Sequence, residues 1–271
     1  MNDLQAFAKL VQALDPWRGQ MIFIGGWGHR LHTLHPDASK QTFEPVFTRD
    51  TDLAFAHRAP LEGNIKEALV EHGFNEEFFG ASKPPAAHYT LGTEENGFYA
   101  EFLTPLIGSP YKRNREPDAT AAVAGISAQK IAHLGVLLVN PWIMRVGPEI
   151  GVPLERPVDL QVANPLCFMV QKFLILDDRT KKKRQQDLLY VHDTLLLFGH
   201  MLPEFKKTWR DIVKPSLSPK EAAAVEREVP LAFSRVSDDI QAATRIPADR
   251  NLDPEEFLAT CQLSFQMILG A

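Results

Sequence analysis

Two aspartates with one residue between them, Asp50 and Asp52, lie in the stretch RDTDLAF and limit how this chain can fold. Successive side chains on a strand point to opposite faces, so a strand here places both carboxylates on one face and Thr51 on the other. Two like charges about 4 Å apart repel by roughly 4 kcal/mol at an effective dielectric constant of 20. Apolar residues follow, which a solvated turn would not show. We therefore expect Mg²⁺, which prefers carboxylate and phosphate oxygens, to neutralise the pair.

Upstream of the aspartates, the apolar run MIFI ends at Gly25 and Gly26, and a polar insertion follows that must loop out. Glycine lets the backbone approach an anion closely, and a helix that begins near Trp27 would direct its first amides at that anion. Each motif alone is weak, because strand-to-helix turns need no ligand and aspartate pairs arise by chance. The order of strand, glycines, helix and acidic strand is what favours a nucleotidyl-transfer site.

A third carboxylate lies in the strand-like run GFYAEFL. Glu101 shares one predicted face with Tyr99 and Leu103 and stands among apolar neighbours. An acid inside such a strand is costly unless it is paired or bound to a metal, so Glu101 is the candidate third carboxylate beside Asp50 and Asp52. The alternative is an edge-strand charge that faces water.

Basic residues gather in two places. Lys112, Arg113 and Arg115 lie in a loop with prolines and a glycine, where they form either a solvated surface or a substrate contact. The helical stretch DDRTKKKRQQDLLYVHDTLLLFG is basic at its start, although cations are mildly unfavourable at a helix N-terminus. Within it Lys183 and Asp187 have the spacing of an ion pair, which on a surface would stabilise by only about 0.3 to 0.5 kcal/mol.

Composition limits the class of protein. The 271 residues suffice for one large or two modest domains. No apolar run reaches the roughly 18 residues of a membrane span, and the N-terminal residues do not resemble a signal peptide. Cys167 and Cys261 lie in apolar stretches, which favours buried thiols and a cytoplasmic location. The net charge of −5 argues against broad nucleic-acid binding but leaves room for a local basic patch that holds RNA.

The secondary-structure pattern changes partway along the chain. Strand-like runs, including WIMRV and VDLQV, dominate the first part, where we also expect a helix over 127–139. The second part is helical and begins with PLCFMVQKFLIL, which contains Lys172. Later helices are expected over 204–213, 218–229, 231–244 and 253–269. We therefore expect an α/β (α+β) fold, with a mixed-sheet core flanked by helices over 1–163 and a helical domain over 164–271.

Three blocks of the sequence belong together: Gly25-Gly26 after a strand, Thr48-Arg49-Asp50-Thr51-Asp52-Leu53, and Lys172 with Arg184-x-x-Asp187. Together they resemble the nucleotidyltransferase-like proteins of the DNA polymerase β superfamily, in particular the AbiEii-type group that includes toxins of type IV toxin–antitoxin systems. The similarity covers about residues 20 to 195. It implies a nucleotidyltransferase core and a helical domain that contributes Lys172 and Asp187 to the nucleotide site.

The resemblance also implies roles for single residues. These are phosphate binding by Gly25 and Gly26, metal binding by Asp50 and Asp52, nucleotide binding by Arg49, Lys172 and Arg184, and positioning of Lys172 or the nucleotide by Asp187. Glu101 is added from the strand pattern. The implied reaction is Mg²⁺- or Mn²⁺-dependent transfer of a nucleoside monophosphate from an NTP such as ATP to an acceptor hydroxyl. The implied acceptor is a tRNA or RNA 3′ end, and the implied protein partner is a cognate antitoxin.

Two alternatives to this function stay open. A protein or a small molecule such as an antibiotic would serve as acceptor at the same metal site. A non-catalytic domain would keep the fold and bind a nucleotide or a partner. The retained pair Asp50 and Asp52 argues against the second alternative, because a site without a cation could lose the repulsion by replacing one acid.

Overall fold

The chain divides into two compact units. The computed structural model describes residues 2–46, 48–56, 58–80, 85–92 and 97–270. The sheet unit is Met1–Gly28 with Phe47–Ala163, and the helical unit is His29–Val46 with Asn164–Ala271. The division falls inside helix α2 (Gly25–Thr33), so residues 29–46 group with the helices that follow residue 163.

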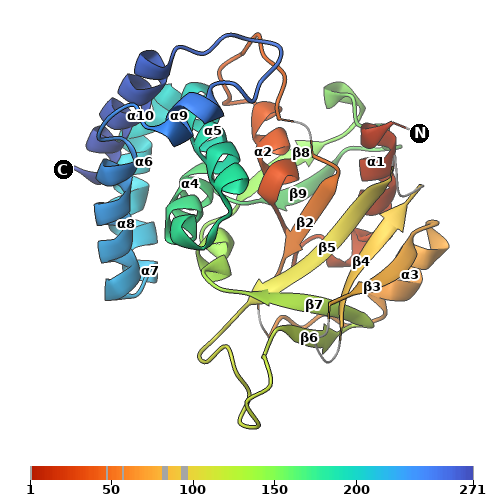
Figure 1. Ribbon diagram of the computed structural model, residues 1–271. Helices are drawn as coiled ribbons and strands as arrows, with labels where there is room; N and C mark the ends of the chain where they lie inside the picture. Colours follow the sequence, from red (N-terminus) through yellow and green to blue (C-terminus); the bar gives the residue numbers. More distant parts are fainter. Residues whose placement is uncertain (1, 47, 57, 81–84, 93–96, 271) are drawn as a thin grey trace. The chain divides into compact units, whose positions relative to one another are not determined.

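A mixed sheet forms the sheet unit, as the sequence predicts (Figure 1). Among the described residues it has nine strands, whose main path is β3-β4-β5-β2-β1-β9-β8, and β7 pairs with both β5 and β6. Strand β2 pairs with β5 in parallel and with β1 in antiparallel orientation. The strands are β1 (Ile22–Ile24), β2 (Asp50–Ala54), β3 (Asn75–Phe79), β4 (Ala86–Leu91), β5 (Phe98–Pro105), β6 (Thr120–Val123), β7 (Ile126–Ile131), β8 (Trp142–Val146) and β9 (Val158–Val162).

Helices α1 (Asp3–Ala13) and α3 (Ile65–Glu71) lie side by side on one face of this sheet (Figure 1). The core beneath them is aromatic. The Phe7 ring stacks on Trp27 with 4.3 Å between ring centroids, and Trp27 meets the Phe98 ring of β5 edge-on at 5.6 Å. Since side chains alternate along a strand, the opposite face of β5 carries its polar residues.

The prediction of a helix over 127–139 is wrong. Residues Ile126–Ile131 form strand β7, and only Leu134–Leu138 form a short 3₁₀ helix. Tertiary pairing overrides the local pattern, because β7 has strand partners on both sides, antiparallel β6 and parallel β5.

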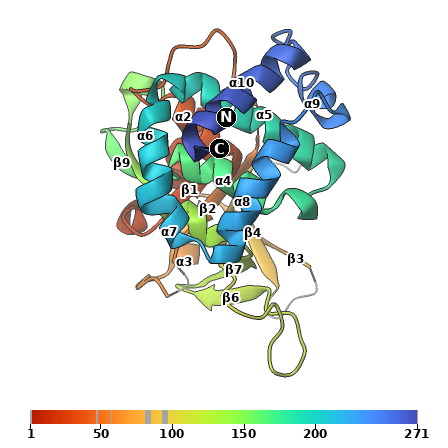
Figure 2. The ribbon, with the colours of Figure 1, turned by 90° about the vertical axis from the view of Figure 1, so that its left-hand side faces the viewer.

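The helical unit packs around α10 (Pro254–Leu269), which lies between α6 and α8 in Figure 2. Its Phe265 ring contacts the Phe173 and Phe233 rings at 5.3 and 5.8 Å between centroids.

Among the described residues, no helix is both long and apolar enough to cross a membrane. The other helices are α4 (Pro165–Leu174), α5 (Lys181–Phe198), α6 (Leu202–Thr208), α7 (Lys214–Ser216), α8 (Pro219–Ala232) and α9 (Asp238–Ala243).

The prediction of one continuous helix over 231–244 is also wrong, because the chain turns between α8 and α9. Helix α8 ends at Ala232, and α9 begins at Asp238 after the N-cap Ser237. The Ser237 hydroxyl accepts a hydrogen bond from the Ile240 amide at 3.3 Å, which favours a new helix start at this point.

The polar insertion before Asp50 has no helix or strand over residues 35–46 of the described chain, yet it is tied to the helical unit. The Ser39 amide donates to the Leu197 carbonyl at 2.8 Å, and the Arg250 guanidinium lies 3.6 Å from the Phe43 ring centroid. The insertion is a loop, as expected, but it packs as part of the helical unit.

Candidate active site

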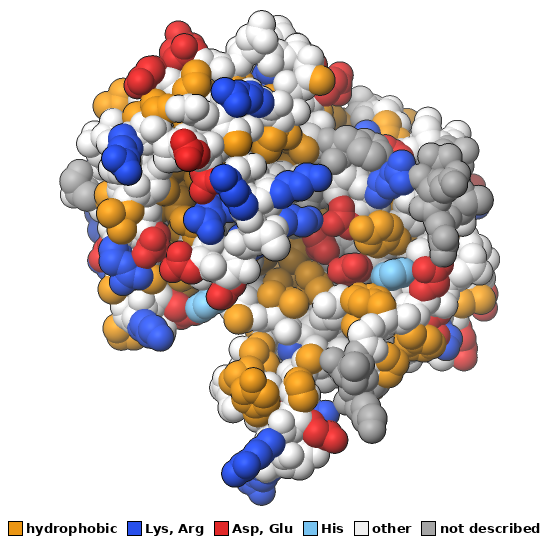
Figure 3. Space-filling view, in the orientation of Figure 1, with side chains coloured by type: hydrophobic (Ala, Val, Ile, Leu, Met, Phe, Trp, Pro, Cys, Tyr) orange, Lys and Arg blue, Asp and Glu red, His pale blue; other side chains and the backbone are white. Residues whose placement is uncertain are grey.

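Three carboxylates share one face of the sheet. In the parallel register of β2 and β5, Asp52 lies opposite Glu101 and Asp50 lies opposite Tyr99. Paired strands are about 4.8 Å apart, so Asp50, Asp52 and Glu101 are close neighbours on this surface, here called the acidic face. Thr51 points to the other face and is fully buried. Figure 3 shows acidic side chains gathered over β2 and β5.

Burial and the negative charge of the acidic face both raise the pKa of the Tyr99 hydroxyl. Burial first, and then the negative charges of Asp50, Glu101 and Asp52, raise its pKa to about 12. The hydroxyl therefore stays protonated at neutral pH and can donate a hydrogen bond to an anion. Tyr99 lies two residues from Glu101 and so shares its strand face, but a tyrosine in a strand gives no signal of a site in the sequence.

Further polar residues continue the acidic face across β4 and β7. His88 lies opposite Glu101 in the antiparallel register, and its Nε2 is 2.9 Å from Glu77 Oε2. Gln129 Nε2 donates to Glu101 Oε2 at 3.4 Å. Hydrogen bonds from His88 and then from Thr90 lower the pKa of Glu77 below its ordinary value. These neighbours were missed because strand order and register cannot be read from one sequence.

The Asp52 carboxylate lies against the start of α2. Gly25 has a φ of 61°, and a Cβ at this position would collide with the Asp52 carboxylate. The helix begins at Gly25, earlier than the expected start near Trp27. Trp27 is only 1% exposed and packs in the aromatic core, so its bulk does not fill the glycine turn. Phosphate binding by Gly25 and Gly26 stays a prediction.

The acidic face suits a hard divalent cation. Mg²⁺ in proteins is commonly held by one or two carboxylates and completed by waters and substrate phosphates. Among the described residues, no three His, Cys, Asp or Glu side chains form a group that could hold an ion by themselves. The carboxylates of Asp50, Asp52 and Glu101 are donors of the kind that hold such a cation when a phosphate-bearing ligand completes its coordination. The Asp50 carboxylate also accepts a hydrogen bond from the Thr48 hydroxyl.

In the helical unit, Lys172 of α4 and Asp187 of α5 form an ion pair with 2.8 Å between Nζ and Oδ1. Arg179 Nε lies 2.7 Å from the other oxygen, Oδ2, and we call these three residues the buried ion cluster. Lys172 and Asp187 are 6% and 2% exposed, and the ammonium lies over the Phe168 ring at 5.0 Å from its centroid. The sequence spacing predicts Lys183 as a partner of Asp187, whereas in the structure Asp187 pairs with Lys172 and Arg179.

The neighbours of Asp187 control its protonation. Burial by itself raises the pKa of this carboxyl, but the charges and hydrogen bonds of Lys172 and Arg179 outweigh that effect, so the pKa lies below its ordinary value. Asp187 is therefore ionised at neutral pH and holds the Lys172 ammonium in place. Its role at a nucleotide stays a prediction.

The two remaining predicted residues are arginines, one in each unit. Arg49 is exposed just before β2, and its carbonyl accepts a hydrogen bond from the Tyr99 amide at 3.2 Å. Arg184 of α5 pairs with Asp239 of α9 at 3.6 Å. Nucleotide binding by these arginines stays a prediction.

Comparison with known protein families identifies the family to which the sequence is similar. Residues 2–214 match a protein family described as Nucleotidyltransferase. The match includes the whole acidic face and the buried ion cluster. A search of curated proteins found no match.

Proposed function

The chain belongs to the nucleotidyltransferase family that residues 2–214 match, and from this premise we propose that it moves a nucleoside monophosphate from an NTP to an acceptor hydroxyl. The observation that carries the proposal is the register that places Asp50, Asp52 and Glu101 on one sheet face. Three like charges in neighbouring positions repel one another, and a cation that accompanies a nucleotide would remove that repulsion.

In the proposed reaction the acceptor oxygen attacks the α-phosphorus. A new oxygen–phosphorus bond forms, the bond to the bridging oxygen of pyrophosphate breaks, and the acceptor proton is released. When bound, Mg²⁺ or Mn²⁺ would neutralise the phosphates and acidify the acceptor hydroxyl. Asp50 and Asp52 would hold the cation, and Glu101 would be either a further ligand or the base that takes the proton. The Gly25 backbone would lie against the phosphates.

We propose RNA, in particular the 3′ end of a tRNA, as the acceptor. The resemblance to the AbiEii-type group supports this choice, and it also supports a cognate antitoxin as a protein partner. A protein hydroxyl or a small molecule would use the same metal site, so the acceptor has to be tested separately from the chemistry.

The test uses NTPs radiolabelled at the α-phosphate, incubated with the full chain and, separately, with total RNA, lysate proteins or small molecules. We expect label in RNA, and about a thousandfold less of it with Asp50→Asn, because a lost metal ligand removes most of the charge neutralisation. The matched control is Asp159→Asn, an exposed aspartate of the same sheet, which should keep wild-type activity.

The outcomes separate the acceptor from the chemistry. Label in protein or in a small molecule would overturn the RNA acceptor alone. A folded Asp50→Asn protein that transfers as well as wild type would overturn the assignment of the acidic face. Failure of the wild type to bind an NTP with Mg²⁺ would support a non-catalytic domain.

A further inference from the structure

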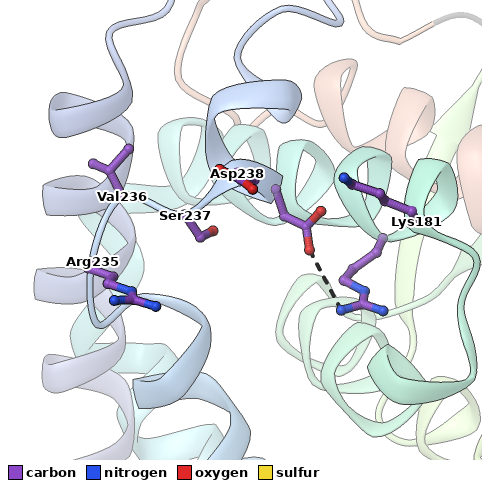
Figure 4. A pocket seen from close by; sticks show the side chains of 7 residues that line it. Lys181, Arg235, Val236, Ser237 and Asp238 are labelled. Carbon is purple, nitrogen blue, oxygen red and sulfur yellow. Dashed lines mark ion pairs between the residues drawn. The ribbon is translucent and has the colours of Figure 1, made fainter.

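A second charged site lies within the helical unit, in a pocket of about 540 Å³. The first turn of α5 forms one wall, and the turn between α8 and α9 forms the other (Figure 4). The lining residues are Lys181, Arg184, Arg235, Val236, Ser237, Asp238 and Asp239. In Figure 4 the Arg235 and Lys181 side chains extend toward the space between these walls.

Positive charge dominates this pocket. Asp239 is engaged, because Arg184 lies 3.6 Å from one of its oxygens and Gln185 donates to the other at 3.1 Å. Within the part of the chain that the structure describes, Lys181 and Arg235 form no ion pair, and Arg184 Nε is buried without a hydrogen-bond partner. Since Arg184 and Asp239 offset one another, Lys181 and Arg235 remain against Asp238 among the lining residues, and this net positive charge attracts anions.

The charge extends beyond the pocket along the start of α5. Lys181, Lys182, Lys183 and Arg184 follow one another, and the three lysines are exposed. Within the described residues, the Thr180 side chain makes no capping hydrogen bond to α5, and the first turn of α5 contains no acid. Cations repel one another and interact unfavourably with a helix N-terminus, so this arrangement lowers local stability unless an anion is bound. Figure 3 shows Lys and Arg side chains gathered over α4 and α5.

We propose that this pocket binds the phosphodiester backbone of a nucleic-acid strand, the one that carries the acceptor hydroxyl. Lys181, Arg184 and Arg235 would contact a phosphate in the pocket, and Lys182 and Lys183 would contact its neighbours along the strand. A single free anion would leave those two lysines without a role. Backbone contacts position a strand without reading its sequence, so binding is sequence-tolerant and salt-dependent. Only the identification of the strand as acceptor rests on the proposed function.

The test measures binding of fluorescently labelled single strands to the full chain by anisotropy, without NTP or divalent cation. RNA and DNA of the same sequence distinguish the two sources of the backbone. Arg235→Gln, which lies outside the acidic face and the buried ion cluster, should weaken binding and reduce the slope of log affinity against log salt by about 1. The ratio of wild-type to variant affinity should then change about threefold between roughly 50 and 200 mM salt.

The matched control is Arg227→Gln, an exposed arginine of α8 that does not line the pocket and should leave both affinity and slope unchanged. Circular dichroism checks that each variant is folded. Unchanged strand binding by Arg235→Gln, equal losses in both variants, or weakened NTP binding in place of strand binding would each overturn the inference. If strand binding falls as expected while wild-type protein transfers no nucleotide, the proposed function fails and the strand site stands.

Discussion

The acidic face places like charges next to one another, whereas the buried ion cluster places opposite charges in contact. On the sheet, Asp50, Asp52 and Glu101 are half-exposed and place like charges side by side. In the helical unit, Asp187 is buried between Lys172 and Arg179. In the buried ion cluster two cations flank one carboxylate, whereas on the acidic face three carboxylates are neighbours, and we propose that a cation from solution offsets their repulsion.

This difference separates two kinds of role. A buried pair with satisfied partners holds helices in place, and removing one partner leaves a buried charge uncompensated. Like charges placed side by side repel one another, and such arrangements are typical of ligand-binding sites. We therefore expect substitutions in the buried ion cluster to change stability first, and substitutions on the acidic face to change activity first.

The largest expected effect is on the stability of Asp187→Ala. Its free energy of unfolding should fall by about 3 to 5 kcal/mol, because the buried Lys172 ammonium loses its counterion. Urea denaturation followed by circular dichroism measures this. The double variant Lys172→Met/Asp187→Leu, which removes both charges and keeps the volume, should regain most of the loss. A change below about 1 kcal/mol in the single variant would contradict a structural role for the pair.

A smaller effect is expected on the pH dependence of stability, through the buried His29 of the helical unit. Burial lowers its pKa to about 4; Lys172 and Arg250 add to this and Asp193 opposes it. Between the ordinary value of 6.5 and about 4, the unfolded chain binds the proton and the folded chain does not. The stability contributed by neutral His29 is therefore present above pH 6.5 and is lost as the pH falls, by roughly 3 kcal/mol in total.

The variant His29→Leu should remove that dependence. Urea midpoints of wild type and variant, measured from pH 7 to pH 4, should converge or cross as the wild type weakens. The exposed His200→Gln variant is the control and should follow wild type. Parallel curves for wild type and His29→Leu would show that this histidine does not govern acid stability.

On the acidic face, Glu101→Gln should lower kcat about a hundredfold with little change in stability, whether the residue is a metal ligand or the base. Glu77→Gln is a matched control, since Glu77 continues the same face two strands away and bonds to His88. Steady-state transfer assays compare the two variants. Equal losses would mean that the general negative charge of the face matters more than the position beside Asp52.

The smallest effect is expected for Lys183→Gln. This exposed lysine has the sequence spacing of a partner for Asp187, but Asp187 is held by Lys172 and Arg179. The free energy of unfolding of the variant, from its urea denaturation curve, should differ from that of wild type by less than about 0.5 kcal/mol. A loss as large as that of Asp187→Ala would show that the lysine belongs to the buried ion cluster in solution.

The same contrast explains what sequence could predict. On the acidic face the alternation in DTDLA and FYAEF places the acids on one side of each strand, so a shared face for Asp50 and Asp52 follows from local geometry. That β2 lies beside β5, with Asp52 opposite Glu101, depends on long-range pairing. His88 and Gln129 enter the site only through that pairing.

The helical unit was less predictable because its site residues depend on turns. Arg179 follows a 3₁₀ turn before α5 and reaches Asp187 from outside the helix, where helical spacing gives no guide. Arg235 lines its pocket only because the chain turns between α8 and α9. The N-cap sequence Ser237-Asp238-Asp239 was the available signal for that turn.

We propose that the acidic face binds a divalent cation together with a nucleotide. Calorimetric titration of a non-hydrolysable NTP with Mg²⁺ into wild type and Asp52→Asn tests this proposal. We predict binding by wild type and at least about tenfold weaker binding by the variant, because the substitution removes a carboxylate that would hold the cation. Equal affinity in the two proteins would show that Asp52 does not bind the cation.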